Sequence, residues 1–245
     1  MKVSKTTMAS IQVVDSVLTA APNEIVFAGD EVRLAGQIDY PSTPRPADGY
    51  PLLFVLHHAC CNARDDYRDY AQLALANGYA VFRWDKRGTG RSGASGRGST
   101  TQDAVNAYEI ALSQPGINHK RAVILAVGAG TGLLGSSFGL FARVQHPYAV
   151  LLVANALDEN EILALDTRVH IMMSTRDWNS ADVYGEAAAK AHRKAYRHGA
   201  TYYVSDNSDR LLMNADAYGR TVMEANAQKV IGNWLNDLTR LSASS

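Results

Sequence analysis

The sequence predicts an α/β protein with a mostly parallel central sheet, antiparallel strands on its N-terminal side and helices on both faces. From Leu52 onward, short apolar runs alternate with longer segments of helical periodicity, which requires crossover helices packed on a parallel sheet. The apolar run at residues 122–127 ends abruptly in small residues, as a buried strand does before a tight turn into a helix. The 245 residues are 47% hydrophobic, so we expect one core and a single domain over residues 1–245.

The N-terminal part of the chain has strand periodicity only. Residues 11–18, 24–27 and 32–40 alternate apolar and polar side chains, which predicts antiparallel strands at one side of the sheet. Gly29 lies between the last two segments and predicts a hairpin there. Residues 41–51 contain four prolines in eleven positions, so we expect a surface connection that is neither strand nor helix.

The remaining segments alternate in order along the chain. Strands are predicted at residues 52–57, 80–84, 122–127, 149–154, 168–174 and 201–205, and helices at residues 65–77, 100–114, 130–144, 185–198 and 218–238. Thr100 and Asp103 have the spacing of a capping box at the start of the second helix. Only residues 155–167 are available for a cap over the sheet, which predicts a minimal cap and an open pocket.

Composition excludes several classes of partner. Lysine plus arginine equals aspartate plus glutamate at 24 each, so no global field favours nucleic acid or an anionic membrane. The first residues lack the apolar core of a signal peptide, and no window approaches the roughly 18 apolar residues of a membrane span. The adjacent Cys60 and Cys61 favour reduced thiols, and the histidines lack metal-ligand spacing. We expect a cytoplasmic protein without metal or cofactor.

Residues 52–93 carry a resemblance to a known family. The stretch LLFVLHHACCNARDDYRDYAQLALANGYAVFRWDKRGTGRSG resembles the front half of an α/β-hydrolase, in which a strand ends in His-Gly, a helix follows, and the next strand runs into D-x-R-G-x-G-x-S. That motif is here Asp85, Arg87, Gly88, Gly90 and Ser92. The similarity extends over about residues 24–238 and is closest to small serine esterases and serine aminopeptidase-like hydrolases. It implies an α/β-hydrolase fold acting on a small ester-like substrate at the carboxyl ends of the strands.

The turn after residues 122–127 has the shape of this family's nucleophile elbow, G-x-S-x-G. In that alignment Ala126 and Gly130 occupy the small positions, and Gly128 occupies the tip where the family has its nucleophilic serine. A second register, residues 128–132, puts Gly130 at the tip and again supplies no nucleophile. The resemblance also implies that the backbone N–H of Ala129 would contact an oxyanion.

The family's acid and base positions are also altered. The strand at residues 168–174 runs into STRDW, similar to the family's strand followed by G-x-x-D, which places Asp177 at the acid position. The alternative is an ordinary solvated loop aspartate. After the last strand the family commonly has Asp-His, whereas this chain has Asp209 and Arg210. Arginine stays protonated and offers donors only, so the general base is missing as well.

His58 replaces the glycine of the family's His-Gly, in the loop that donates a second oxyanion N–H. In one interpretation, His57 is a core histidine and His58 only fills the pocket. In the other, His58 is a new base or nucleophile, with Cys60, Cys61 or Asp177 nearby. We predict catalytic positions at His58, Gly128, Asp177 and Arg210, and pocket positions at His57, Ala59, Cys60 and Ala129.

A glycine-rich loop offers one further possibility. Residues 88–93 match G-x-G-x-x-G after a strand, but more glycines follow in place of a helix, so the match does not predict a dinucleotide site. The basic side chains of this loop predict a solvated segment near the pocket rim. Three hypotheses remain. The first is an esterase-type scaffold whose Ser-His-Asp catalysis has been lost or removed by substitution, either in a degenerate homologue or in a deliberately rebuilt site. The second is an enzyme rebuilt around His58, and the third is a non-catalytic protein that binds a small apolar ligand.

Overall fold

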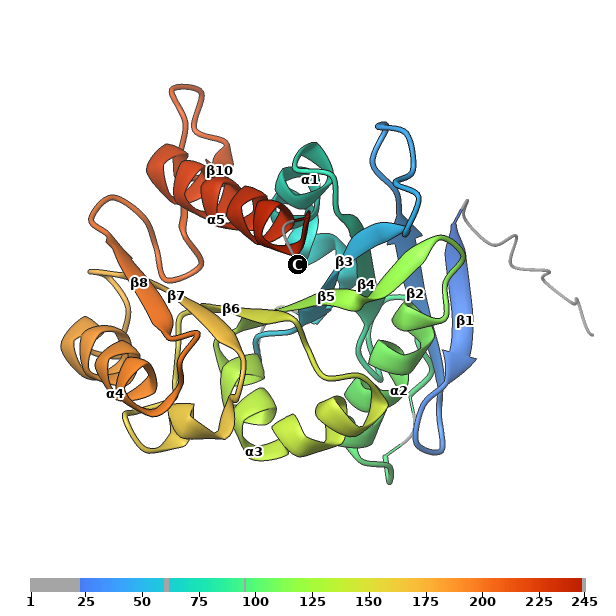
Figure 1. Ribbon diagram of the computed structural model, residues 1–245. Coiled ribbons are helices and arrows are strands. Elements are labelled where there is room, and N and C mark those ends of the chain that lie inside the picture. Colours follow the sequence, from blue (N-terminus) through green and yellow to red (C-terminus); the bar gives the residue numbers. More distant parts are fainter. Residues whose placement is uncertain (1–22, 60–61, 95, 244–245) are drawn as a thin grey trace, which may run out of the picture.

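The computed structural model describes residues 23–59, 62–94 and 96–243. The strand expected at residues 11–18, and Cys60 and Cys61, lie outside the described residues. Eight strands form one sheet in the order β1-β2-β4-β3-β5-β6-β7-β8 (Figure 1). Their bounds are β1 (Glu24–Ala28), β2 (Arg33–Asp39), β3 (Tyr50–Leu56), β4 (Ala80–Asp85), β5 (Ile117–Val127), β6 (Ala149–Val153), β7 (Arg168–Ser174) and β8 (Ala200–Ser205).

The sheet is antiparallel at one side and parallel everywhere else. β1 pairs with β2, and β2 pairs with β4, both in antiparallel register. The expected hairpin around Gly29 joins β1 to β2, and the Gly29 N–H donates to Val32 O (2.7 Å). From β4 to β8 every pairing is parallel. The predicted mostly parallel sheet with antiparallel N-terminal strands is therefore confirmed.

Helices cover both faces of this sheet. Figure 1 shows α1 (Arg68–Ala76) and α5 (Ala225–Ala243) on one face, and α2 (Thr100–Leu112), α3 (Ala129–Val144) and α4 (Ala188–Ala195) on the other. Shorter turns are η1 (Arg64–Tyr67), η2 (Glu161–Ala164) and the π-helical η3 (Asp182–Ala187). Between β6 and β7 the chain forms only the single turn η2.

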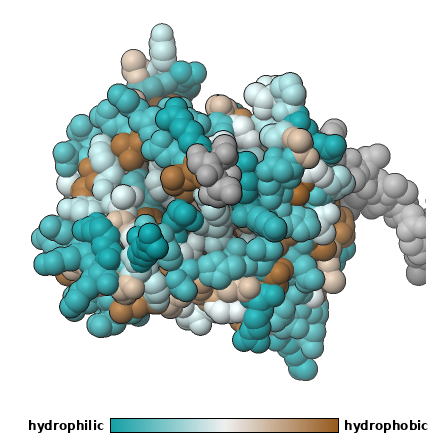
Figure 2. Space-filling model, viewed as in Figure 1, coloured by the Kyte–Doolittle hydropathy of each residue, from teal (hydrophilic) through white to brown (hydrophobic). Residues whose placement is uncertain are grey.

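The central strands are apolar on both sides because both faces are covered. In β3, Leu52 and Phe54 pack in the cluster that faces α2 and α3, whereas Leu53 and Val55 pack in the cluster that faces α1 and α5. This follows from the two-residue side-chain period of a strand. The face of the molecule in Figure 2 is mainly hydrophilic, with small separate hydrophobic patches. No helix in the described part of the chain combines the length and apolarity of a membrane span.

The prediction that residues 41–51 contain no strand is wrong at its end, because β3 begins at Tyr50 and includes Pro51. Tyr50 pairs with Ile117 and Leu52 pairs with Ala122, so the register with β5 shifts at the proline. A proline cannot donate to a ladder, and a strand tolerates it at such an irregularity.

The prediction of a helix from residue 218 is also wrong, because α5 begins only at Ala225. The preceding residues form a hairpin, β9 (Met213–Ala215) with β10 (Thr221–Met223). Asp216 closes its turn, since Oδ1 accepts from the N–H groups of Tyr218 (2.8 Å) and Arg220 (2.9 Å). Glu224 then accepts from the N–H of Ala227 (2.8 Å) and so satisfies a donor in the first turn of α5.

The capping box predicted for Thr100 and Asp103 does not form. The N-cap of α2 is Ser99, whose Oγ accepts from the N–H of Gln102 (3.2 Å). Asp103 is buried and instead accepts from Arg87 Nε (2.7 Å). The predicted helix at residues 185–198 is divided into η3 and α4, and α4 ends at Ala195.

Candidate functional site

Gly128 is the single residue between β5 and α3. Its φ of +52° lies in the left-handed region, which a residue with a Cβ adopts only with strain. The Gly128 N–H donates to Val153 O (2.8 Å), and its carbonyl accepts from the Thr131 N–H (2.9 Å). The turn therefore has the elbow geometry with Gly128 at its tip, and Gly130 already lies in the first turn of α3.

Gly130 is small because the first turn of α3 approaches the end of β3 closely. A Cβ built on Gly130 would lie 2.7 Å from Leu56 O and 2.8 Å from His57 O. Ala126, the small residue before the tip, is fully buried. The spacing of small residues therefore has the steric cause that the sequence pattern indicates.

The imidazole of His58 fills the space in front of Gly128. A Cβ built on Gly128 would lie 1.9 Å from His58 Cδ2 and 2.5 Å from His58 Nε2. The backbone of His58 is held in place, because its N–H donates to Tyr67 Oη (2.6 Å) and its carbonyl accepts from Lys86 Nζ (3.0 Å). No side chain fits at the tip of the turn unless this ring moves.

Burial and neighbouring charges keep the imidazole of His58 neutral near pH 7. Burial is the largest cause that lowers its pKa from the usual 6.5, and the positive charges of Arg210 and Lys86 lower it further. The charge of Asp177 opposes them. His58, Asp177 and Arg210 therefore interact electrostatically although they come from different loops.

Asp177 follows β7 and Arg210 follows β8, so adjacent parallel strands bring the two together. Arg210 Nη2 lies 3.6 Å from Asp177 Oδ1, and the guanidinium stacks over the Trp178 ring at 4.3 Å from its centroid. The Asp177 side chain is 0% exposed, so the alternative of a solvated loop aspartate is wrong. Among the described residues, Asp177 Oδ2 has no hydrogen-bond partner.

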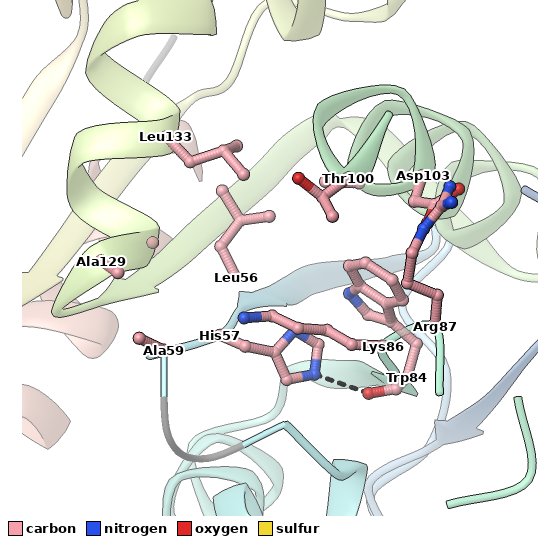
Figure 3. Close-up of a pocket in the computed structure, with 12 residues that line it drawn as sticks. Leu56, His57, Ala59, Trp84, Lys86, Arg87, Thr100, Asp103, Ala129 and Leu133 are labelled. Atoms are coloured by element: carbon pink, nitrogen blue, oxygen red, sulfur yellow. Dashed lines mark hydrogen bonds and ion pairs between the residues drawn. The ribbon is translucent and has the colours of Figure 1, made fainter. Parts of the chain in front are cut away.

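A cavity of about 350 Å³ lies beside the elbow. Leu56, Trp84 and Leu133 form apolar walls, and the N-terminus of α3 borders it at Ala129 (Figure 3). The Lys86 side chain extends past His57 toward the side on which Ala59 lies. The predicted pocket residues His57, Ala59 and Ala129 line the cavity, whereas Cys60 lies outside the described residues. His58, Gly128, Asp177 and Arg210 are not among its lining residues.

His57 is a structural wall residue. Its Nε2 lies 2.6 Å from Trp84 O, and because a carbonyl only accepts, Nε2 carries the proton. Burial lowers the pKa of His57 to about 3, and the charge of Lys86 adds to this effect. The ring is therefore neutral, and Nδ1 has no hydrogen-bond partner in the described part of the chain.

The D-x-R-G-x-G-x-S segment holds the loop after β4 in place. The Asp85 carboxylate accepts from the N–H of Arg64 (2.8 Å) and of Arg91 (3.0 Å), and Ser92 Oγ donates to Asp85 O (2.6 Å). The arginines here are paired, so the prediction of a solvated basic segment is wrong for them. The ion pairs are Arg83–Asp39 (2.7 Å), Arg87–Asp103 (2.7 Å) and Arg91–Glu24 (3.1 Å).

Sequence reasoning placed Lys86 only among the basic side chains near the pocket rim, and it missed Tyr67 and Thr100. Lys86 directly follows β4, so its position at the carboxyl end of a parallel strand was a signal for a pocket residue. Tyr67 and Thr100 carry no such signal, because their places depend on how η1 and α2 pack. Within residues 23–59, 62–94 and 96–243, no group of three or more histidine, cysteine or carboxylate side chains could hold a metal ion.

Comparison with solved structures identifies the fold. The chain is similar to an esterase of Pyrococcus furiosus (TM-score 0.63, 12% identity, 88% of this chain and 90% of that chain). It is also similar to an acetyl xylan esterase from Paenibacillus sp. R4 (0.61, 12%, 87% and 83%) and to an α/β hydrolase enzyme from a Medee basin deep-sea metagenome library (0.62, 14%, 88% and 97%). No protein-family model and no curated protein matches the sequence. The chain has the α/β-hydrolase fold.

Proposed function

We propose that residues 1–245 form a single α/β-hydrolase domain of carboxylic-ester-hydrolase lineage that lacks conventional serine hydrolysis and binds a small ligand beside the elbow. The observation that carries this proposal is the position of His58. Its ring takes the volume in which the Cβ of a nucleophile at position 128 would lie. The absence of a serine at position 128 is therefore accompanied by a second change, His58, whose ring fills the space that the serine side chain would need.

The acid and base positions support the same conclusion. Asp177 remains beside a cation, but that cation is Arg210, which cannot accept a proton from a hydroxyl. Nucleophile, base and loop glycine are all replaced, while the fold and the elbow backbone are kept. The esterases among the similar structures are consistent with this lineage.

The cavity favours a small ligand with an apolar body and one oxygen-bearing end. Leu56, Trp84 and Leu133 supply apolar surface. At one side the ammonium of Lys86 and the N-terminus of α3 at Ala129 offer donors to a carbonyl or carboxyl oxygen. A volume of about 350 Å³ is within the range of small-molecule sites.

A second candidate function is catalysis by His58. The lowered pKa leaves its imidazole neutral at pH 7, which is the form that acts as a base or nucleophile, and the charge of Asp177 acts on the ring. In this case, His58 would attack or deprotonate a substrate without an acyl-serine.

The two candidate functions predict different effects of His58→Ala on ester hydrolysis. We expect no hydrolysis of p-nitrophenyl acetate or butyrate above buffer by the wild type or by His58→Ala. If His58 is catalytic, the wild type hydrolyses these esters, His58→Ala loses the rate, and the exposed control His119→Ala keeps it. Hydrolysis that survives His58→Ala contradicts both candidates.

Ligand binding is measured separately by thermal shift with a panel of small aliphatic and aromatic esters and acids. We expect at least one to raise the Tm of the wild type without turnover. Leu133→Trp fills the cavity and should abolish that shift, whereas Leu163→Trp, at an exposed position outside the cavity, should retain it. Equal shifts in both variants would place the binding elsewhere.

A further inference from the structure

A second cavity, of about 470 Å³, lies at the opposite edge of the sheet from the elbow. It is bordered by the first residues of β7 and β8, by the end of α4 and by the last turns of α5. Gly128 and Asp177, in contrast, follow the carboxyl ends of β5 and β7. This groove therefore shares no residue with the elbow cavity.

Three arginines line the groove without acidic partners: Arg168, Arg193 and Arg197. Within the described chain, none of them lies within ion-pair distance of a carboxylate; Arg193 donates to Ala200 O (2.9 Å) and Arg168 lies over the Tyr148 ring (4.8 Å). Arg64, Arg83, Arg87 and Arg91, in contrast, each form an ion pair with a carboxylate. The charge of these three arginines is thus left to solvent or a ligand.

The single carboxylate that lines the groove does not neutralise this charge. Asp237 pairs with Arg240 (3.5 Å), which is outside the lining. Arg193 belongs to the last turn of α4, where a cation complements the helix dipole, but Arg168 and Arg197 lie outside the helices. The lining therefore carries three arginine charges against one carboxylate.

Aromatic rings form the other part of the lining. The Trp234 ring stacks on the buried His170 ring with centroids 5.4 Å apart and planes at 21°. Tyr196 stacks on His198 with centroids 5.5 Å apart and planes at 7°. These stacks fix the orientation of three lining rings, Trp234, Tyr196 and His198, which together form the aromatic wall of the groove. Such a surface favours a planar apolar group.

We propose that this groove binds an organic phosphate with a planar ring, of the size of a nucleoside monophosphate. Planar guanidinium groups match the oxygens of a phosphate in paired hydrogen bonds, and the aromatic wall takes the ring. A neutral apolar ligand would cover the three arginines without pairing them. A carboxylate alone would leave the aromatic wall unused.

Isothermal titration at low salt tests the proposal with AMP, and with adenosine and inorganic phosphate as separate arms. We expect saturable binding of AMP, with adenosine and phosphate each weaker by about tenfold or more, because each engages half of the groove. Arg168→Ala with Arg197→Ala should weaken AMP by about tenfold or more, and added salt should weaken it in the wild type. The exposed Arg97→Ala, in the loop between β4 and α2 and outside the groove lining, should bind like the wild type.

Three results would overturn the proposal: no saturable AMP binding at about 1 mM, equal binding by the double variant, or equal loss in Arg97→Ala. If the double variant is unstable, Arg197→Ala alone carries the test. Arg197 is exposed and makes no hydrogen bond or ion pair within the described residues, so we expect Arg197→Ala to fold like the wild type. AMP affinity unchanged in Arg197→Ala would then exclude the site.

Discussion

Gly128 and His58 occupy adjoining space so closely that neither position is independent of the other. The elbow turn holds Gly128 at positive φ, and the ring of His58 lies where a Cβ would be. A residue with a side chain at position 128 would meet two separate penalties, backbone strain and overlap with the imidazole. A substitution at position 58 can remove the overlap but not the backbone strain, so the two penalties can be measured separately.

Gly128→Ser should lower the free energy of unfolding by about 2 kcal/mol or more. Positive φ at a residue with a Cβ costs about 1–3 kcal/mol, and forced overpacking costs about 1–3 kcal/mol. The reduced chain entropy of the unfolded state returns at most about 1 kcal/mol. Urea unfolding followed by circular dichroism measures the difference.

His58→Gly in the same chain should remove the overlap while the backbone strain remains. The double-mutant cycle should therefore show a favourable coupling of about 1–3 kcal/mol between positions 58 and 128. His119→Gly serves as the matched control and should show additive effects, because His119 is exposed on β5. Additivity for both pairs would mean that the His58 ring does not occupy the place of the missing side chain.

Two glycines of α3, Gly130 and Gly132, allow a test of how closely this helix packs against the end of β3. Gly130→Ala would place a methyl group 2.7 Å from Leu56 O, and the backbone there cannot yield as a flexible side chain can. We expect a loss of about 1–3 kcal/mol in the free energy of unfolding. Gly132→Ala meets no atom within 4 Å and should stabilise α3 by about 0.5–1 kcal/mol. Equal effects at the two positions would contradict the close approach.

The contact of β7 with α5 makes stability depend on pH through His170. Burial lowers the pKa of His170 from 6.5 to about 4, and its Nδ1 lies 2.6 Å from Thr201 Oγ1. Between these two pH values, the unfolded chain binds a proton that the folded chain does not. The free energy of unfolding should therefore fall as the pH falls from 6.5 toward 4, by up to about 1.4 kcal/mol per pH unit from this histidine.

His170→Phe should reduce that slope while keeping the ring that stacks on Trp234. Urea unfolding at several pH values from 7 to 4.5 measures the slope in both proteins. The buried His57, with a pKa lowered to about 3, contributes in the same direction and remains in both. An unchanged slope would show that His170 is protonated in the folded protein in this range.

At the scale of the whole molecule, four chain segments meet at one edge of the sheet. His58 follows β3, Gly128 follows β5, Asp177 follows β7 and Arg210 follows β8. The His58 ring fills the space in front of Gly128, and Arg210 forms an ion pair with Asp177. The charges of Arg210 and Asp177 both act on the pKa of His58. If the hydrolase lineage is correct, serine chemistry should return when the replaced positions are restored together.

Gly128→Ser with Arg210→His and His58→Gly should hydrolyse small activated esters. Gly128→Ser alone should not, because no base activates the hydroxyl and the His58 ring obstructs it. The triple variant should have a higher rate than the Gly128→Ser/Arg210→His double variant, because His58→Gly reopens the oxyanion loop. An oxyanion contact contributes about 3 kcal/mol in the transition state. Initial rates with p-nitrophenyl acetate measure these differences.

Asp177→Asn in the triple variant is the control, and it should reduce the rate sharply because the amide misorients the imidazole tautomer. The gains should be far from additive, because triad residues act as a unit. A folded triple variant that binds an ester analogue without turnover would show that position 177 or 210 does not hold the triad role, and the lineage would explain only the fold.

The sequence by itself determined the properties that depend on residue type and local period. The two-residue and helical periods predict the order of strands and helices, because both faces of a parallel sheet must be covered. The small residues at positions 126, 128 and 130 predict the elbow. Arg210 excludes a base at its position whatever its surroundings, since no environment in a protein makes it an acceptor.

The tertiary structure decided everything that depends on contacts between distant segments. Only packing shows that the His58 ring fills the space at Gly128, that the Asp177 side chain is wholly buried beside Arg210, and that the arginines after β4 have carboxylate partners. The late start of α5 follows from hydrogen bonds of Asp216 and Glu224, which compete with helix formation before residue 225. Local sequence does not contain these outcomes, because the free energy of each contact is set by which side chains the assembled sheet brings into the same volume.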